Sequence, residues 1–243
     1  MNYLIMLQLI LLFSSSQNIA SHEGQSVRIQ SHDGFILNAV YYTGGMPGPG
    51  ILLLHQCDRE ESAPTGYENL ASMLANKRFH VLMLDFRAYG KSTSEEFMRK
   101  DWKKAHGHFG EDVEAAYNFL TAQSGVDKTQ TGVAGASCGA REAIMLAARH
   151  AEVKTLVFLS GAIMGESASE YQKLTHLPVL CIVSEGDRYG SGTVQSMKDA
   201  FSQSKNENSR LLLFKGPNHG TPLFAQDSHL ETTIVEWFRA HLE

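Results

Sequence analysis

Short, uninterrupted apolar runs that alternate with amphipathic stretches restrict the fold of this sequence more than any other feature. A strand of four to six residues that is apolar throughout suits a parallel sheet buried on both faces. Regular alternation of such strands with helices implies right-handed βαβ crossovers. The sequence therefore predicts an α/β fold with a doubly wound, mostly parallel sheet and helices on both faces. The apolar runs occupy residues 50–55, 81–85, 132–135, 155–159, 179–183 and 211–214, and the helical stretches residues 67–76, 111–123, 141–150, 194–203 and 229–241.

The amino-terminal part follows a different pattern. Residues 26–31 and 36–42 alternate apolar and polar side chains around Asp33-Gly34, which is typical of an antiparallel hairpin. Residues 160–177 join two predicted strands and have room for one short helix, near residues 170–174. We therefore expect an antiparallel edge to the sheet and no large lid domain.

The length and the first residues predict the domain organisation. The chain has 243 residues, and residues 21–243 suffice for a single α/β domain. The apolar run within residues 1–13 is shorter than the roughly 20 residues that span a bilayer. It matches the hydrophobic region of a signal peptide over residues 1–20, which predicts export to the periplasm or the medium. No Lys or Arg precedes the run and Asn18 replaces a small residue, so an uncleaved membrane anchor is the alternative.

The charge of the chain makes nucleic acid an improbable partner. The formal net charge is -5 and the pI is about 6.1, so no overall positive field attracts phosphate. The one basic stretch, residues 99–104, lies beside Glu95, Glu96 and Asp101. Mixed charges of this kind indicate a solvated loop or helix face.

Polar residues follow the apolar runs, at the strand ends where ligands of such sheets bind. Ser137 lies in Gly135-Ala-Ser137-Cys-Gly139, between an apolar run and a helical stretch. Small residues are needed there because the turn from strand to helix is very tight. The helix amino terminus also directs backbone N–H groups toward a developing oxyanion. Ser137 is therefore the predicted nucleophile.

A serine hydroxyl needs a base that is itself oriented by an acid. His219 lies in a turn directly after the last apolar run. Other histidines precede the sheet, begin a strand or fall on predicted helical surfaces, and these are His22, His32, His80, His150, His229 and His241. Asp187 follows the run that ends at Val183, and Glu185 is the alternative acid. The order Ser137, Asp187, His219 is the order of triads in this kind of fold.

These residues give the chain a resemblance to the α/β-hydrolase superfamily, and within it to dienelactone hydrolases and small bacterial carboxylesterases. The resemblance implies a serine hydrolase that cleaves small carboxylic esters through an acyl-enzyme, without metal or organic cofactor. It also implies an oxyanion hole built from the backbone N–H groups of Cys138 and Cys57, with Gln56 as the alternative to Cys57. A small peptidase or amidase of the same fold, or a non-catalytic interaction protein, is the alternative function. The resemblance is carried by residues 31–37, 54–58, 85–92, 112–116 and 135–139 and by the Asp187 and His219 loops.

The sequence departs from the family pattern near the predicted site. Gln56 replaces a usual glycine and is expected to narrow the acyl pocket or alter the oxyanion loop, while Ala88 and Ala140 replace two further glycines. Dienelactone hydrolase itself uses a cysteine nucleophile, so Ser137 favours general esterase activity over the lactone substrate.

Three cysteines are too few for a disulfide scaffold or a thiolate metal site. Cys181 lies within an apolar run and is expected to be a small buried hydrophobic residue. We expect Cys57 and Cys138 to be free, half-buried thiols beside the oxyanion hole, with a disulfide between them as the alternative.

Overall fold

The computed structural model describes residues 23–57 and 65–243. The predicted signal peptide, residues 1–20, lies outside the described residues. Of the described helices, none is both long and apolar enough to cross a membrane.

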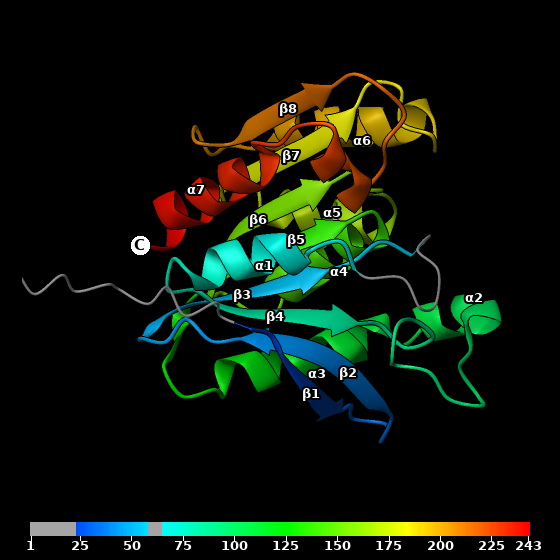
Figure 1. Ribbon diagram of the computed structural model, residues 1–243. Helices are drawn as coiled ribbons and strands as arrows, with labels where there is room; N and C mark the ends of the chain where they lie inside the picture. The colour runs from blue at the N-terminus through cyan, green and yellow to red at the C-terminus, as the bar shows by residue number, and fades with distance from the viewer. Residues whose placement is uncertain (1–22, 58–64) are drawn as a thin grey trace, which may run out of the picture.

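An eight-stranded sheet, with strand order β1-β2-β4-β3-β5-β6-β7-β8, forms the centre of the described chain (Figure 1). The strands β1 and β2 pair antiparallel, as do β2 and β4, and every other pair is parallel. The predicted hairpin and doubly wound sheet are thereby confirmed. The strands are β1 (Gln25–Gln30), β2 (Ile36–Tyr42), β3 (Gly48–Leu54), β4 (His80–Asp85), β5 (Val126–Ala136), β6 (Val153–Leu159), β7 (Val179–Ser184) and β8 (Arg210–Phe214).

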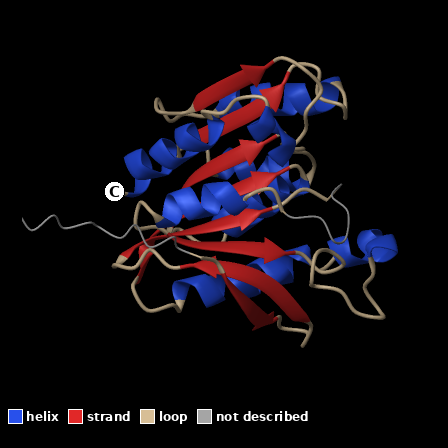
Figure 2. Cartoon of the chain, in the orientation of Figure 1, coloured by secondary structure: helices blue, strands red, loops and turns tan. Residues whose placement is uncertain are grey.

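Helices cover both faces of the sheet and bury two separate apolar clusters (Figure 2). The helices α1 and α7 pack together on one face, while α3, α4, α5 and α6 contribute to the cluster on the other. The helices are α1 (Glu68–Ala75), α2 (Trp102–His106), α3 (Phe109–Thr121), α4 (Cys138–Ala147), α5 (Glu166–Lys173), α6 (Ser191–Gln203) and α7 (Leu230–Leu242), with short 3₁₀ helices η1 (Arg99–Asp101) and η2 (Thr221–Ala225).

Two elements differ from the sequence prediction, and a third agrees with it. The strand β5 begins at Val126, earlier than predicted. The sequence did not predict its first half because that half is polar and largely exposed and has no apolar run. The helix α5 begins at Glu166, four residues before the expected position, and covers most of the short connection after β6. The basic stretch forms η1 and α2, with Lys103 and Lys104 exposed as expected of a solvated helix face.

A buried arginine fixes the chain after β4. Arg87 is fully buried and donates hydrogen bonds to Asp112 on α3 and to Asp33 in the β1–β2 turn. These hydrogen bonds hold the pKa of Asp33 well below its usual range. Arg87 therefore joins three elements through its ion pairs: the β1–β2 turn, the end of β4 and α3.

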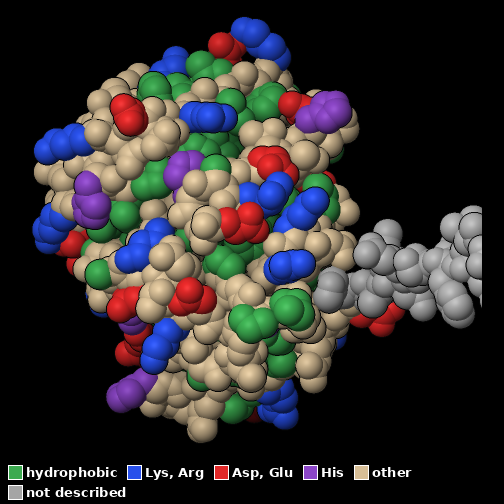
Figure 3. Space-filling view, turned by 90° about the vertical axis from the view of Figure 1, so that its left-hand side faces the viewer, with side chains coloured by type: hydrophobic (Ala, Val, Ile, Leu, Met, Phe, Trp, Pro, Cys, Tyr) green, Lys and Arg blue, Asp and Glu red, His purple; other side chains and the backbone are tan. Residues whose placement is uncertain are grey.

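The edge at the amino ends of the parallel strands carries charges of both signs. Figure 3 views the molecule from this direction and shows Lys and Arg side chains interspersed with Asp and Glu. The polar residues singled out in the sequence belong to the opposite edge, where the parallel strands end.

Candidate functional site

The turn that carries Ser137 is the sharpest feature of the carboxyl edge. Ser137 stands between the end of β5 and the start of α4 with φ 52° and ψ −114°, a conformation that is costly for a residue other than glycine. A Cβ at position 135 would lie 2.3 Å from the Gly139 carbonyl oxygen, and one at position 139 would lie 2.5 Å from the Leu54 carbonyl oxygen. Both flanking glycines are therefore required by close backbone packing.

Three backbone N–H groups at this edge are available to a ligand. Cys138 is the first residue of α4, so its N–H has no acceptor within the helix. The N–H groups of Gln56 and Cys57, just beyond β3, have no hydrogen-bond acceptor among the described residues. The geometry is consistent with an oxyanion hole between the start of α4 and the loop after β3.

Cys57 and Cys138 form a disulfide, with 5.9 Å between their Cα atoms and 81 residues between them in the sequence. The expectation that they are free thiols is therefore wrong. Its physical cause is the contact between the end of β3 and the start of α4, where the missing side chain of Gly139 lets the two backbones touch. Cys181 is free and buried as expected, and burial raises the pKa of its thiol to about 12.

His55 fixes the start of the loop after β3. Its Nδ1 lies 2.8 Å from the Gln56 carbonyl oxygen, and its Nε2 accepts the Phe86 N–H at 3.1 Å. Because a carbonyl oxygen only accepts and an N–H only donates, the ring is neutral with its proton on Nδ1. This histidine is a positioning group for the loop, tied to the end of β4.

Gln56 joins the loop after β3 to the loop that carries His219. Its Oε1 lies 3.1 Å from the Thr221 hydroxyl and accepts the Thr221 N–H at 3.4 Å. The Thr221 hydroxyl also lies 3.1 Å from the Thr65 carbonyl oxygen. The residue that replaces the usual glycine therefore connects two loops of the site.

Asp187 and His219 form a buried pair. Nδ1 of His219 lies 2.9 Å from both carboxylate oxygens of Asp187. His219 is 2% exposed and Asp187 is 4% exposed. The carboxylate also accepts the Tyr189 N–H at 2.9 Å. Backbone hydrogen bonds from Gly186 to Gly216 and from Arg188 to Pro217 hold the two loops together.

The second nitrogen of His219 has no partner. Nε2 is buried and makes no hydrogen bond within residues 23–57 and 65–243, to Ser137 or to any other group. The ring of Tyr189 lies edge-on to the imidazole with 4.4 Å between ring centroids. In the absence of substrate, catalytic hydrogen bonds are often long, so this geometry leaves His219 available as a base.

Glu185, the alternative acid, has a different partner. Its side chain is 42% exposed and forms an ion pair with Lys215. The hydrogen bond from Lys215 lowers the pKa of the Glu185 carboxyl. The structure therefore pairs His219 with Asp187 and places Glu185 at the surface.

Large side chains at this edge differ in their exposure to solvent. Phe86, Tyr89 and Tyr171 are fully buried, and the Tyr171 hydroxyl donates to the Ala200 carbonyl oxygen. Met164 and Tyr189 are 65% and 57% exposed. These two residues are the better candidates for contacts with a substrate.

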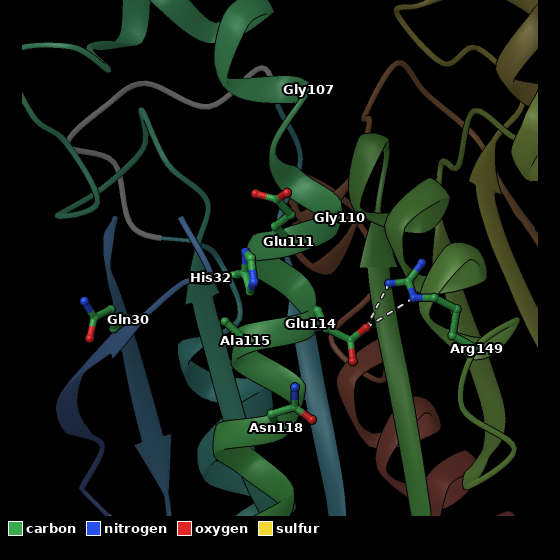
Figure 4. Close-up of a pocket in the computed structure, with 9 residues that line it drawn as sticks. All are labelled: Gln30, His32, Gly107, Gly110, Glu111, Glu114, Ala115, Asn118 and Arg149. Carbon is green, nitrogen blue, oxygen red and sulfur yellow. Dashed lines mark hydrogen bonds and ion pairs between the residues drawn. The ribbon is translucent and has the colours of Figure 1, made fainter. Parts of the chain in front are cut away.

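Two other features do not include Ser137, Asp187 or His219. Asp33, His108 and Glu111 are close enough to share a metal ion, but Asp33 is already paired with Arg87, whose positive charge opposes a cation. A groove along α3 is lined by Glu114 and Arg149, which form an ion pair, but by none of Ser137, Asp187 and His219 (Figure 4).

Three residues support the site through contacts that the sequence does not predict. Thr221 holds Gln56, while the Tyr89 hydroxyl and the Arg99 guanidinium both donate to the Cys57 carbonyl oxygen. Tyr89 follows β4 in the motif that includes Ala88, but Thr221 and Arg99 carry no signal in a single sequence. Arg99 is thus a contact of the loop after β3 rather than a purely solvated charge.

The sheet order, the helices on both faces and the serine turn after β5 define an α/β-hydrolase. The chain belongs to the dienelactone hydrolase family, whose model matches residues 43–233.

Solved structures support the fold assignment. An esterase of Pyrococcus furiosus, Pf2001, superposes with a TM-score of 0.74 at 18% identity, over 92% of this chain and 94% of that one. A dienelactone hydrolase of Anabaena variabilis gives 0.72 at 19% identity, over 92% and 100%. A cold-adapted esterase from an Arctic intertidal metagenomic library gives 0.70 at 18% identity, over 92% and 96%.

Curated relatives cover less of the chain. An uncharacterised protein of Mycobacterium tuberculosis, found in two strains, is 29% identical over 126 residues. The match covers 51% of this chain and 41% of the relative.

Proposed function

We propose that this protein is a serine hydrolase that cleaves small carboxylic esters through an acyl-enzyme. The observation that carries the proposal is the buried Asp187–His219 pair at the edge where the Ser137 turn lies. Nε2 of His219 has no hydrogen-bond partner among the described residues. Membership of the dienelactone hydrolase family supports hydrolysis, and the esterases among the structural neighbours support an ester substrate.

In the first half of the reaction, the Ser137 Oγ attacks the ester carbonyl carbon while His219 Nε2 takes the hydroxyl proton. Asp187 holds the proton on Nδ1 and stabilises the imidazolium that forms. The tetrahedral intermediate then expels the alcohol, which takes the proton from Nε2 and leaves an acyl group on Ser137. Water repeats the sequence, so that the acid leaves and Ser137 regains its proton.

Backbone N–H groups stabilise the negative oxygen of each tetrahedral intermediate. Cys138 supplies one donor from the start of α4, and Cys57 supplies the other from the loop after β3. Such donors act mainly in the transition state, because the charge on the oxygen develops there.

We propose small substrates because the connection after β6 holds only α5 and adds no lid over the site. Met164 and Tyr189 are the exposed side chains best placed to contact the acyl or alcohol group. Short acyl esters are therefore expected to be hydrolysed faster than long ones.

We further propose that the protein is exported. The apolar run within residues 1–13 supports this localisation, and so does the Cys57–Cys138 disulfide, since disulfides persist mainly in oxidising compartments.

The test of the proposed function is Ser137→Ala in p-nitrophenyl acetate and butyrate hydrolysis, together with fluorophosphonate labelling and peptide mapping. We expect kcat to fall by about 10⁴-fold or more and the label to disappear from the peptide that contains residue 137. Ser160→Ala is the matched control, because Ser160 also ends a strand with positive φ, at 51°, and should leave labelling at Ser137 intact. Undiminished turnover in Ser137→Ala would refute the proposal, as would exclusive labelling of another residue.

A further inference from the structure

The Cys57–Cys138 disulfide joins the two segments that carry the N–H groups of the proposed oxyanion hole. Cys138 is the residue directly after Ser137, and Cys57 ends the described loop after β3. The two donors are thus the two ends of one covalent bridge. An oxyanion hole requires its donors to be held about 2.7 to 3.1 Å from a single point, so the separation between these segments matters directly.

The two ends of the bridge are held with unequal firmness by the rest of the protein. Cys138 belongs to α4 and to a turn in which Ser137 N–H donates to the Leu159 carbonyl oxygen at 2.9 Å. Cys57 lies outside any helix or strand, packs against the apolar cluster, and accepts hydrogen bonds from Tyr89 and Arg99 at its carbonyl oxygen. The peptide that carries the Cys57 N–H is oriented by His55, whose Nδ1 lies 2.8 Å from the Gln56 carbonyl oxygen. These contacts tie Cys57 to the β3 and β4 side of the site, and the disulfide ties it covalently to the residue after Ser137.

We propose that this disulfide is a positioning element of the oxyanion hole, so that turnover by the site requires Cys57 and Cys138 to be oxidised. The inference rests on the proposed function and adds a redox dependence to it. Both cysteines are half-buried, which leaves the bridge open to attack by small thiols.

Reduction proceeds by thiol–disulfide exchange. A thiolate of a dithiol attacks one sulfur of the bridge, forms a mixed disulfide and releases the other cysteine as a thiolate that takes up a proton. The second thiol of the dithiol then displaces the remaining cysteine. Two electrons and two protons pass to Cys57 and Cys138, and the dithiol becomes a cyclic disulfide. The freed Cys57 segment can then move away from α4, and the oxyanion loses one aligned donor.

The experiment compares the oxidised wild-type protein with the same protein reduced by dithiothreitol, at a temperature where circular dichroism shows both to be folded. Thiol titration under denaturing conditions should rise from one to three, because Cys181 is free in both forms. We expect kcat for p-nitrophenyl acetate to fall by about 10- to 100-fold on reduction with little change in KM, since an oxyanion donor acts in the transition state. Reoxidation should restore kcat.

A second readout separates a positioning role from a purely structural one. A trifluoromethyl ketone analogue of the ester forms a tetrahedral adduct with an oxyanion, so its inhibition constant should rise by the same factor as kcat falls. A disulfide that only stabilises the fold would lower the unfolding temperature on reduction without changing either quantity. That result would overturn the proposal.

Two variants serve as controls. Cys181→Ala retains the bridge, and its response to dithiothreitol should match that of the wild type. The double variant Cys57→Ala/Cys138→Ala should show the low kcat of the reduced protein with or without dithiothreitol. If this variant does not fold, the reversible cycle of the wild-type protein still decides the question.

The outcomes for the two proposals differ. Absence of Ser137 labelling in the oxidised wild type would refute the acyl-enzyme function itself. Normal labelling and turnover in the oxidised form, combined with unchanged kcat and inhibitor affinity after full reduction, would refute only the role of the disulfide.

Discussion

The two halves of the candidate site are held together by different kinds of bond. On the β7 and β8 side, Asp187 and His219 are joined by hydrogen bonds, and Nε2 of His219 has no partner in the described chain. On the β3 and β5 side, the loop after β3 and the start of α4 are joined by a disulfide. The Asp187–His219 half is held by hydrogen bonds and has one histidine nitrogen without a described partner, whereas the two segments of the other half are joined by a covalent bond.

The difference matches what each half has to do in the proposed reaction. A general base must accept and return a proton, so one of its nitrogens has to stay available. Oxyanion donors contribute most when they do not rearrange as charge develops, so they benefit from rigid attachment. Gln56 and Thr221 connect the halves through buried hydrogen bonds to the Gln56 Oε1.

The largest expected effect comes from breaking the hydrogen-bonded half with Asp187→Asn. An asparagine amide can donate to Nδ1 and so favour the tautomer with the proton on Nε2, which cannot accept the Ser137 proton. We expect kcat to fall by about 10⁴-fold, measured with p-nitrophenyl butyrate. Glu185→Gln is the matched control, because this exposed carboxylate is paired with Lys215, and its kcat should stay within about twofold of wild type. A larger loss in Glu185→Gln than in Asp187→Asn would reverse the assignment of the acid.

The connection between the halves is tested by Thr221→Val. The change removes the hydroxyl that lies against Gln56 Oε1 and the Thr65 carbonyl oxygen, and leaves both acceptors buried. We expect the free energy of unfolding to fall by about 1 to 3 kcal/mol and kcat by up to about tenfold, as followed by urea denaturation and steady-state kinetics. Thr155→Val removes a buried hydroxyl at the start of β6, where it bonds Pro178 and Trp237. This control should lose stability but retain kcat, and a similar loss of kcat in both variants would show that the halves are not specifically coupled by Thr221.

A smaller effect is expected when the covalently closed half loses a supporting hydrogen bond. Tyr89→Phe removes the donor to the Cys57 carbonyl oxygen while the disulfide and the ring remain. We expect a decrease in kcat of about 2- to 10-fold with KM unchanged, and a larger sensitivity to dithiothreitol than in wild type. Tyr117→Phe loses a comparable hydrogen bond, to Thr131, and should not change kcat. If Tyr89→Phe also left kcat and the reductant response unchanged, the hydroxyl would have no part in holding the loop.

The smallest effect concerns the surface of the hydrogen-bonded half. Tyr189→Ala removes the ring that lies 4.4 Å from the His219 ring and exposes the imidazole to water. We expect a change in kcat/KM of about two- to fivefold for p-nitrophenyl esters, because the ring contributes packing and no chemistry. Phe201→Ala, at a similarly solvent-facing aromatic residue on α6, should have no effect. A loss of 100-fold or more in Tyr189→Ala would mean that the ring belongs to the catalytic machinery.

The fold could be predicted from the sequence because its parallel strands are buried on both faces and therefore continuously apolar. The runs at residues 155–159 and 179–183 lie within β6 and β7. The first half of β5 was not predicted for the converse reason: its side chains at Asp127, Lys128 and Thr129 are exposed, so this half of the strand has no apolar run.

The residues of the candidate site could be selected from the sequence because the carboxyl ends of parallel strands lie at the same edge of the sheet. The sequence placed Asp187 and His219 at one edge, and the structure pairs their side chains. The disulfide could not be derived in this way, because it depends on the distance between backbones 81 residues apart. The direction of the Gln56 side chain was equally inaccessible, since its partner Thr221 lies 165 residues further along the chain.

The disulfide also restricts which atom can serve as the nucleophile. Dienelactone hydrolase, with which this chain shares a family, uses a cysteine, but a thiolate at position 137 would stand one residue from the Cys138 sulfur. Thiolates attack disulfides, whereas hydroxyl groups do not take part in this exchange. A Ser137→Cys enzyme would therefore have three sulfur atoms able to exchange partners within its own site, and its nucleophile would be consumed in the bridge. The disulfide is thus compatible with a serine hydroxyl as the proposed nucleophile at residue 137. A single Ser137→Cys substitution would not convert the site into one with a working cysteine nucleophile.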